Sequence, residues 1–204
     1  YNSVKHALEV GYRHVDTAQI YRNEVGVGRA IADSGLARED IFLTTKVWND
    51  KHDYELAKAS IDESLEKLGV DYVDLLLIHW PNPVALREND AWKTGNAGAW
   101  KAMEEAYKAG KVRAIGVSNF MIHHLEALLE SAEIKPHVNQ VLLAPGCPQE
   151  ELTAFCRKHD ILLEAYSPLG TGSILNNELV KDMAGKYGKS IAQVALRWSL
   201  QKGF

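Results

Sequence analysis

The sequence has few cysteines and no long apolar run, and these shortages exclude several classes of protein. Its 204 residues contain two cysteines, Cys147 and Cys156, whose spacing matches neither a metal site nor a disulfide framework. We therefore expect reduced thiols and no metal, as in a cytoplasmic protein. The longest apolar stretch, around residues 75–78, is far too short to cross a bilayer. Residues 1–9 lack the apolar segment of a signal peptide.

An excess of charge of one sign is also missing. The net charge is −4 and both signs are interspersed, so no basic stripe indicates a nucleic-acid partner. The sequence is 46% hydrophobic and 25% charged, proportions that are typical of a globular protein in water. We predict a single domain over residues 1–204 that acts as a monomer in the cytoplasm and binds neither nucleic acid nor membrane.

Apolar runs of strand length alternate with stretches of helical period along the whole chain. The candidate strands lie near residues 12–16, 41–47, 73–79, 112–118, 137–143 and 161–167. The candidate helices occupy about residues 3–9, 24–34, 54–68, 98–109, 122–131, 149–159 and 176–202, the last divided by Gly188. This alternation predicts an α/β fold with a parallel sheet, and strands that are apolar at consecutive positions predict burial on both faces.

Two architectures fit this pattern, a doubly wound open sheet and a (β/α)8 TIM barrel. Polar residues of functional type fall at the carboxyl ends of many strands and not at one switch point, which favours the barrel. Six strands are recognisable, whereas a barrel needs eight. Because the sequence opens on one helix and stops after another, we expect the first and last strands to be missing from this chain, which leaves the barrel incomplete at both ends.

Three apolar runs end on an acid, an amine and an imidazole, and a phenol follows the first of them. These residues are Asp16, Lys46, His79 and Tyr21. Parallel neighbouring strands would bring the four side chains together. A free phenol has a pKa of about 10, and a nearby ammonium favours its ionised form while a carboxylate holds that ammonium in place. An imidazole works near neutral pH, so the group predicts a proton-transfer site.

Each of these residues also has a plainer explanation. Asp16 could cap a helix, Lys46 could lie on the surface, and His79 could be a hydrogen-bonded core histidine. A functional site is favoured because the plain explanations would have to coincide at adjacent strand ends.

Several motifs resemble those of the aldo-keto reductases, and they occur in the order of that family. They are residues 11–18 (GYRHVDTA), 21–24 (YRNE), 44–48 (TTKVW), 76–81 (LLIHWP) and 115–120 (IGVSNF). The similarity extends over essentially the whole chain. It implies a (β/α)8 barrel, a nicotinamide cofactor (NADPH, with NADH as the alternative) bound without a Rossmann fold, and reduction of an aldehyde or ketone to an alcohol.

The resemblance implies a role for each matching residue. Tyr21 would be the general acid, Lys46 and Asp16 the pair that tunes it, and His79 the residue that orients a small carbonyl substrate. Trp48 and Trp80 would line an apolar substrate pocket, although either could belong to the core. The residues that match cofactor-binding positions of the family are Asp16, Ser118, Asn119, Gln140, Tyr166, Ser167, Pro168, Leu169 and Thr171.

Some segments depart from the family pattern or stay ambiguous. Residues 142–146 (LLAPG) replace an acidic, aromatic and His-Pro sequence of many members, so local packing is expected to differ. The phosphate-discriminating motif of the family lies beyond residue 204, so the choice of NADPH rests on the resemblance to the family alone.

Residues 26–28 (GVG) lack the third glycine of a dinucleotide fingerprint and lie in a helical pattern. Residues 82–96 form either a lid or a plain surface connection.

Two rival functions stay open at this point. Lys46 at a strand end could form a Schiff base with a carbonyl substrate, as in a barrel aldolase, but Tyr21 and Gln140 would then lack a purpose. A subunit that binds nucleotide and regulates a partner is the second rival, and the presence of all four catalytic-type residues argues against it. The sequence leaves open whether the substrate is sugar-like or a small aliphatic carbonyl.

Overall fold

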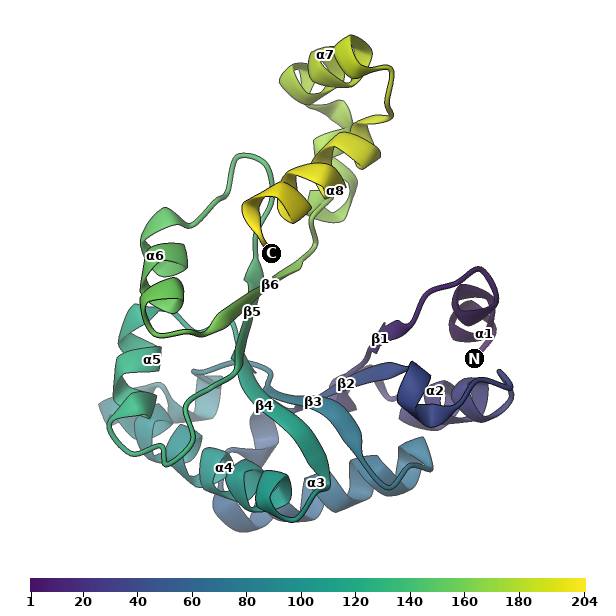
Figure 1. Ribbon diagram of the computed structural model, residues 1–204. Helices are drawn as coiled ribbons and strands as arrows, with labels where there is room; N and C mark the ends of the chain where they lie inside the picture. Colours follow the sequence, from purple (N-terminus) through teal and green to yellow (C-terminus); the bar gives the residue numbers. More distant parts are fainter. The chain divides into compact units, whose positions relative to one another are not determined.

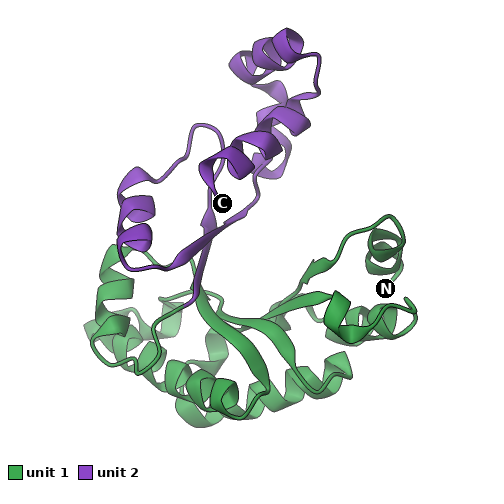
Figure 2. Cartoon of the chain, in the orientation of Figure 1, with its two compact units in different colours: residues 1–136 green, residues 137–204 purple.

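The computed structural model describes all residues 1–204 and divides the chain into two compact units (Figures 1 and 2). Unit 1 is Tyr1–Pro136 and unit 2 is His137–Phe204. A single domain over residues 1–204 stays a prediction. No helix in either unit is both long and apolar enough to reach across a bilayer.

Unit 1 contains four of the six predicted strands, and they pair in parallel in the order of the sequence. They are β1 (His14–Asp16), β2 (Phe42–Val47), β3 (Val73–Ile78) and β4 (Val112–Ser118). A barrel adds neighbouring strands in chain order, whereas a doubly wound sheet reverses direction at a switch point. The order within unit 1 therefore agrees with the barrel.

Helices and single 3-10 turns connect the strands of unit 1 (Figure 1). The helices are α1 (Asn2–Glu9), α2 (Glu24–Ala32), α3 (Tyr54–Leu68), α4 (Ala91–Lys108) and α5 (Ile122–Leu129). The 3-10 turns are η1 (Gln19–Tyr21), η2 (Arg38–Asp40), η3 (Asn49–Lys51), η4 (Val84–Leu86) and η5 (Glu88–Asp90). All five helices predicted for this part of the chain are present.

Helix α4 begins earlier than the prediction of residue 98, and it includes the end of segment 82–96. Trp92 is buried there, and the buried Asn96 side chain donates a 2.9 Å hydrogen bond to the carbonyl oxygen of Pro81. Burial of these two side chains extends the helix into a stretch whose sequence is polar. The segment is therefore partly helical, whereas its sequence predicted either a lid or a plain surface connection.

Unit 2 contains the remaining two strands, which also pair in parallel. Its elements are β5 (Val138–Leu142), α6 (Glu150–Lys158), β6 (Leu162–Tyr166), η6 (Gly170–Asn176), α7 (Glu178–Tyr187) and α8 (Ile191–Lys202). Gly188 ends α7 in the left-handed region with φ of 60°, which confirms the predicted break in the last helical stretch. Both cysteines are free thiols.

Burial on both strand faces was predicted for every strand and holds only for some. All six residues of β3 are buried, and β2 is buried except for Phe42. The prediction was wrong for β1, where only Val15 is buried, and for β6, where Leu162 is 70% exposed. Each of these strands hydrogen-bonds to one neighbour within its unit, so fewer elements cover its side chains.

A buried carboxylate ties together the amino ends of the central strands of unit 1. Asp74 of β3 accepts hydrogen bonds from the backbone N–H of Leu43 (2.9 Å), from Arg38 (2.8 Å) and from Arg113 (3.2 Å). Because Leu43 and Arg113 lie near the starts of β2 and β4, this cluster fixes three strands at one end. The buried carboxylate of Asp74 needs these hydrogen-bond partners, because without them its charge would be uncompensated.

Close packing of α2 on α3 explains the two glycines of residues 26–28. A Cβ atom at Gly28 would lie 2.0 Å from the backbone oxygen of Leu68, whereas one at Gly26 would meet its nearest atom at 3.5 Å. Gly28 is thus required by helix contact. As predicted, the motif lies inside a helix, where a dinucleotide-binding loop does not occur.

We predict that Gly28→Ala lowers the free energy of unfolding by about 1–3 kcal/mol, because a methyl group would push α2 away from α3. Gly26→Ala is the matched control in the same helix, and we expect it to be neutral or to stabilise by up to about 1 kcal/mol. Urea unfolding followed by circular dichroism measures both. Equal effects of the two substitutions would contradict the packing argument.

Candidate active site

The four predicted catalytic-type side chains come from adjacent strand ends of unit 1. Asp16 ends β1, Lys46 lies one residue before the end of β2, and His79 directly follows β3. Tyr21 ends the 3-10 turn η1, which follows β1. The structure brings these side chains into mutual contact, as the parallel order predicts.

The ammonium group of Lys46 is buried and paired with Asp16. Lys46 is 2% exposed, and its Nζ donates hydrogen bonds to Asp16 Oδ1 and, at 3.1 Å, to the carbonyl oxygen of Thr17. A surface position for Lys46 is thereby excluded. Asp16 does not cap the following turn either, because that turn begins after Ala18. The pair satisfies a charge that would otherwise be costly to bury.

The phenol of Tyr21 lies beside both Lys46 and His79. Lys46 Nζ is 5.6 Å from the centre of the Tyr21 ring, and the Tyr21 and His79 rings meet edge-on with centroids 5.9 Å apart. Partial burial, and then the carboxylate of Asp16, raise the pKa of Tyr21 above its ordinary value. The net shift is upward because burial and Asp16 both oppose ionisation, and the predicted tuning of the phenol by Lys46 stays a prediction. Tyr21 keeps its proton.

The imidazole of His79 is buried and neutral. Burial, and then the nearby charge of Lys46, lower the pKa of His79 to about 4, while Asp16 acts in the opposite direction. Its Nδ1 atom is buried and has no hydrogen-bond partner. His79 is therefore not a satisfied core histidine. A neutral imidazole at this place can donate a hydrogen bond to an oxygen atom without carrying charge.

Trp48 and Trp80, the predicted pocket residues, occupy different surroundings. The Trp48 ring meets His79 edge-on, with centroids 5.1 Å apart. Trp80 directly follows His79, and its side chain is 44% exposed. Trp48 thus belongs to the same cluster of side chains, whereas Trp80 is partly exposed to solvent.

Ser118 and Asn119 lie at the end of β4 and contact the same cluster through the backbone. Ser118 is 1% exposed. Asn119 has a left-handed backbone with φ of 63°, and its Nδ2 donates to the carbonyl oxygen of His79 at 2.9 Å and to Ser118 Oγ at 3.1 Å. One hydroxyl and one amide next to His79 form a mixed donor and acceptor set, which suits the carboxamide of a nicotinamide.

The other predicted cofactor-binding residues belong to unit 2. Gln140 is buried on β5, and its Nε2 donates a 2.9 Å hydrogen bond to Glu164 Oε1 on β6. Tyr166 ends β6 and pairs in register with Leu142. The turn after β6 carries Ser167, Pro168, Leu169 and Thr171, and two of these, Ser167 and Thr171, have left-handed backbones. Such turns expose backbone N–H groups, which phosphate groups bind.

The departure from the family pattern after β5 forms a tight turn. The N–H of Cys147 donates to the carbonyl oxygen of Ala144 at 2.8 Å, and Gly146 between them has φ of 89°. Glycine suits this left-handed position. The residues that replace the family sequence are therefore a hairpin-like turn inside unit 2.

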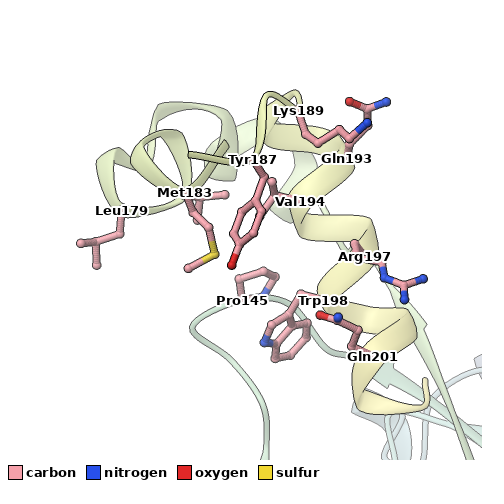
Figure 3. A pocket seen from close by; sticks show the side chains of 11 residues that line it. Pro145, Leu179, Met183, Tyr187, Lys189, Gln193, Val194, Arg197, Trp198 and Gln201 are labelled. Atoms are coloured by element: carbon pink, nitrogen blue, oxygen red, sulfur yellow. The ribbon is translucent and has the colours of Figure 1, made fainter. Parts of the chain in front are cut away.

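Unit 2 also has an apolar cavity of about 600 Å³ beside α7 and α8 (Figure 3). Its wall includes Pro145, Met183, Tyr187 and Trp198. None of the predicted site residues lines it, so this cavity is not the candidate site.

Gln19 is a residue that the sequence pattern did not indicate. Its side chain hydrogen-bonds to the backbone of Trp48 and to helix α3. An uncharged glutamine inside a turn has no periodicity and no characteristic spacing. The only available signal was its place between Asp16 and Tyr21.

Comparisons with known proteins agree with one another. A model of the aldo/keto reductase family matches residues 1–203. Glyoxal reductase of Bacillus subtilis is 53% identical over 201 residues, which cover 98% of this chain and 69% of that protein. Methylglyoxal reductase DkgA of Escherichia coli is 41% identical, with 98% of this chain and 70% of that protein covered. The crystal structure of an aldo/keto reductase from Brucella melitensis superposes with a TM-score of 0.91 at 48% identity, covering 99% of this chain and 75% of that one.

These matches confirm the predicted (β/α)8 barrel class, of which the chain contains six strands. Identities of 41% and 53% over nearly the whole chain, together with the family match, show common family membership and not only a common fold. The chain belongs to the aldo/keto reductase family of NAD(P)H-dependent carbonyl reductases.

Proposed function

We propose that the chain reduces small aldehydes, in particular 2-oxoaldehydes, to alcohols, with Tyr21 as the proton donor and NADPH as the source of hydride. The observation that carries this proposal is the contact of Asp16, Tyr21, Lys46 and His79 at adjacent strand ends. The substrate class is supported by the names of two relatives, a glyoxal reductase and a methylglyoxal reductase.

A bound nicotinamide cofactor would supply the hydride that reaches the carbonyl carbon. Within unit 1, Ser118 and Asn119 offer the hydroxyl and amide groups that its carboxamide requires. Within unit 2, Gln140 offers an amide, Tyr166 an aromatic ring, and residues 167–171 a turn suited to phosphate. Each of these assignments follows the resemblance to the family. The choice of NADPH over NADH rests on the family expectation.

Hydride transfer would leave negative charge on the substrate oxygen, and two neutral donors of this site can stabilise it. His79 donates a hydrogen bond without charge, because its pKa of about 4 keeps it neutral near pH 7. Tyr21 then transfers its proton to the oxygen, which is far more basic than a phenolate. The phenolate that Tyr21 becomes lies beside the Lys46 ammonium, whose charge stabilises it. Lys46 therefore acts on the product of the proton transfer.

The surroundings of the four residues suit a small substrate. Trp48 places an aromatic wall against His79, and Trp80 adds a second, more exposed one. Tyr21 is 50% exposed, so water can restore its proton after each turnover. A single small-molecule partner, a monomeric state and a cytoplasmic location are parts of this proposal.

The rival functions find less support. A Schiff base needs a neutral lysine amine that is free to attack a carbonyl carbon. Lys46 is 2% exposed and its Nζ is bonded to Asp16 and to a backbone carbonyl, so it is not free for such an attack. Family membership also argues against an aldolase. A regulatory subunit would bind NADPH without turnover, and the activity measurement below distinguishes it.

The first test combines cofactor binding with the Tyr21→Phe variant. We expect NADPH to quench tryptophan emission equally in both proteins, while methylglyoxal reduction by Tyr21→Phe falls by about 100-fold or more through loss of the acid. Consumption of NADPH absorbance measures the rate, and NADH in its place ranks the two cofactors. Tyr12→Phe is the matched control, since Tyr12 is 66% exposed on the same unit. Full activity of Tyr21→Phe would refute its role as acid.

The charge states of the site predict a broad pH profile for reduction. His79 titrates with a pKa of about 4 and not near its ordinary value of 6.5, so it is neutral throughout the range above about pH 5. Burial, and then Asp16, raise the pKa of Tyr21, so the phenol stays protonated further into the alkaline range than a free phenol. We expect kcat/KM for reduction to stay level while His79 is neutral and Tyr21 is protonated. It should fall at alkaline pH as Tyr21 loses its proton. It should also change at acid pH as His79 gains a proton. An inflection near pH 6.5 that His79→Gln removes would contradict the neutral imidazole.

We also predict that Gln140→Ala weakens NADPH binding by about ten-fold, roughly the contribution of one hydrogen bond, with little change in overall folding. Fluorescence titration measures the affinity and circular dichroism the fold. Gln193→Ala in the exposed first turn of α8 is the control in the same unit. If the two variants bind NADPH equally well, Gln140 does not belong to the cofactor site.

A further inference from the structure

The turn that carries Tyr21 is held by the side chain of Gln19. Gln19 Oε1 accepts a hydrogen bond from the backbone N–H of Trp48 at 2.9 Å. Gln19 Nε2 donates to the carbonyl oxygen of Ser60 at 3.1 Å and to Ser64 Oγ at 3.0 Å. One planar amide thus connects the first residue of η1, the segment after β2 and helix α3.

The two anchors of Gln19 differ in what they contribute. Ser60 and Ser64 lie one turn apart on α3 and are 3% and 2% exposed. Their helix is fixed at both ends, because Asp53 caps its start and Gly69 ends it in the left-handed region. Trp48, by contrast, belongs to the candidate site through its ring contact with His79. Gln19 therefore connects a well-anchored helix to the wall of the site.

Tyr21 depends on this anchor because its own turn is short. The turn η1 has three residues and no side-chain cap at Ala18. A single 3-10 turn is weak by itself. Its end at Arg22 has a left-handed backbone with φ of 53°, which adds conformational cost. The position of the phenol relative to His79 is thus set largely by what holds the start of the turn.

We propose that Gln19 is a positioning residue that sets the distance between the Tyr21 phenol and the wall formed by Trp48 and His79. The inference rests on the proposed role of Tyr21 as the acid. Glutamine suits this place because one side chain supplies both the acceptor for Trp48 and the donors for α3. Asparagine is one methylene shorter, and glutamate lacks the donors.

The test substitutes methionine, which keeps the length and removes all three hydrogen bonds. We expect kcat for methylglyoxal reduction by Gln19→Met to fall by about 10- to 100-fold, since a small misplacement of a reacting group has effects of this size. The NADPH affinity should stay within about two-fold of wild type, because a lost hydrogen bond to cofactor would change it by more. Exchange of the Trp48 amide hydrogen, measured by NMR, should become faster because its acceptor is gone.

The two serines of α3 provide a matched pair of variants. Ser64→Ala removes one partner of Gln19, whereas Ser60→Ala leaves its backbone carbonyl in place and removes only a bond within the helix. We expect Ser64→Ala to lower kcat several-fold and Ser60→Ala to leave it unchanged. Adding Gln19→Met to Tyr21→Phe should lower the residual rate no further, because coupled residues are not additive.

The outcomes separate this inference from the function on which it rests. If wild type reduces no carbonyl, the proposed function and the inference both fail. If wild type is active and Tyr21→Phe is not, a Gln19→Met variant with wild-type kcat overturns the inference alone. Equal behaviour of Ser60→Ala and Ser64→Ala, or a full additional loss in the Tyr21→Phe background, would also overturn it, because Gln19 would then act on stability and not through Tyr21.

Discussion

The ion pair between the buried Lys46 ammonium and the partly exposed Asp16 carboxylate is the constraint on which the candidate site depends. An ammonium that is 2% exposed is costly to leave unpaired, and Asp16, whose side chain is 34% exposed, supplies its partner. The pair joins the ends of β1 and β2, and so it fixes where the turn with Tyr21 begins. The same ammonium lies beside the Tyr21 ring and lowers the pKa of His79. One charge thus helps to fix the position of one neighbour and adds to the effect of burial on the pKa of another.

The strands of unit 1 carry two ionic clusters with different tasks. At the amino ends, Asp74 binds two arginines and a backbone N–H, and this cluster joins β2, β3 and β4. At the carboxyl ends, the pair of Lys46 and Asp16 leaves Tyr21 half exposed and free to meet a substrate. In barrels the amino ends generally serve stability and the carboxyl ends serve chemistry. The division of charged residues along these strands follows that rule.

Much of the fold could be predicted because strands and helices differ in apolar period, and all six strands occur where the pattern placed them. The early start of α4 could not, since it depends on burial of Trp92 and Asn96 against distant residues. The contact of the four catalytic-type residues followed from parallel order, but the raised pKa of Tyr21 depends on its partial burial and then on the position of Asp16, which only the structure shows. The role of Gln19 could not be predicted from the sequence, because its partners are a backbone N–H and a helix more than forty residues away.

Burial and the placement of the Lys46 and Asp16 charges keep both donors of the site neutral. Burial, and then the charge of Lys46, disfavour the protonated imidazole of His79, and burial, and then Asp16, disfavour a negative charge on Tyr21. Both donors therefore enter the reaction in the state that lets them stabilise charge on a substrate oxygen. When Tyr21 gives up its proton, the new phenolate stands beside the only nearby ammonium, which it shares with Asp16. Asp16 and Lys46 thus act in opposite directions on a negative charge at the Tyr21 oxygen, and their balance depends on how closely the phenol is held to Lys46.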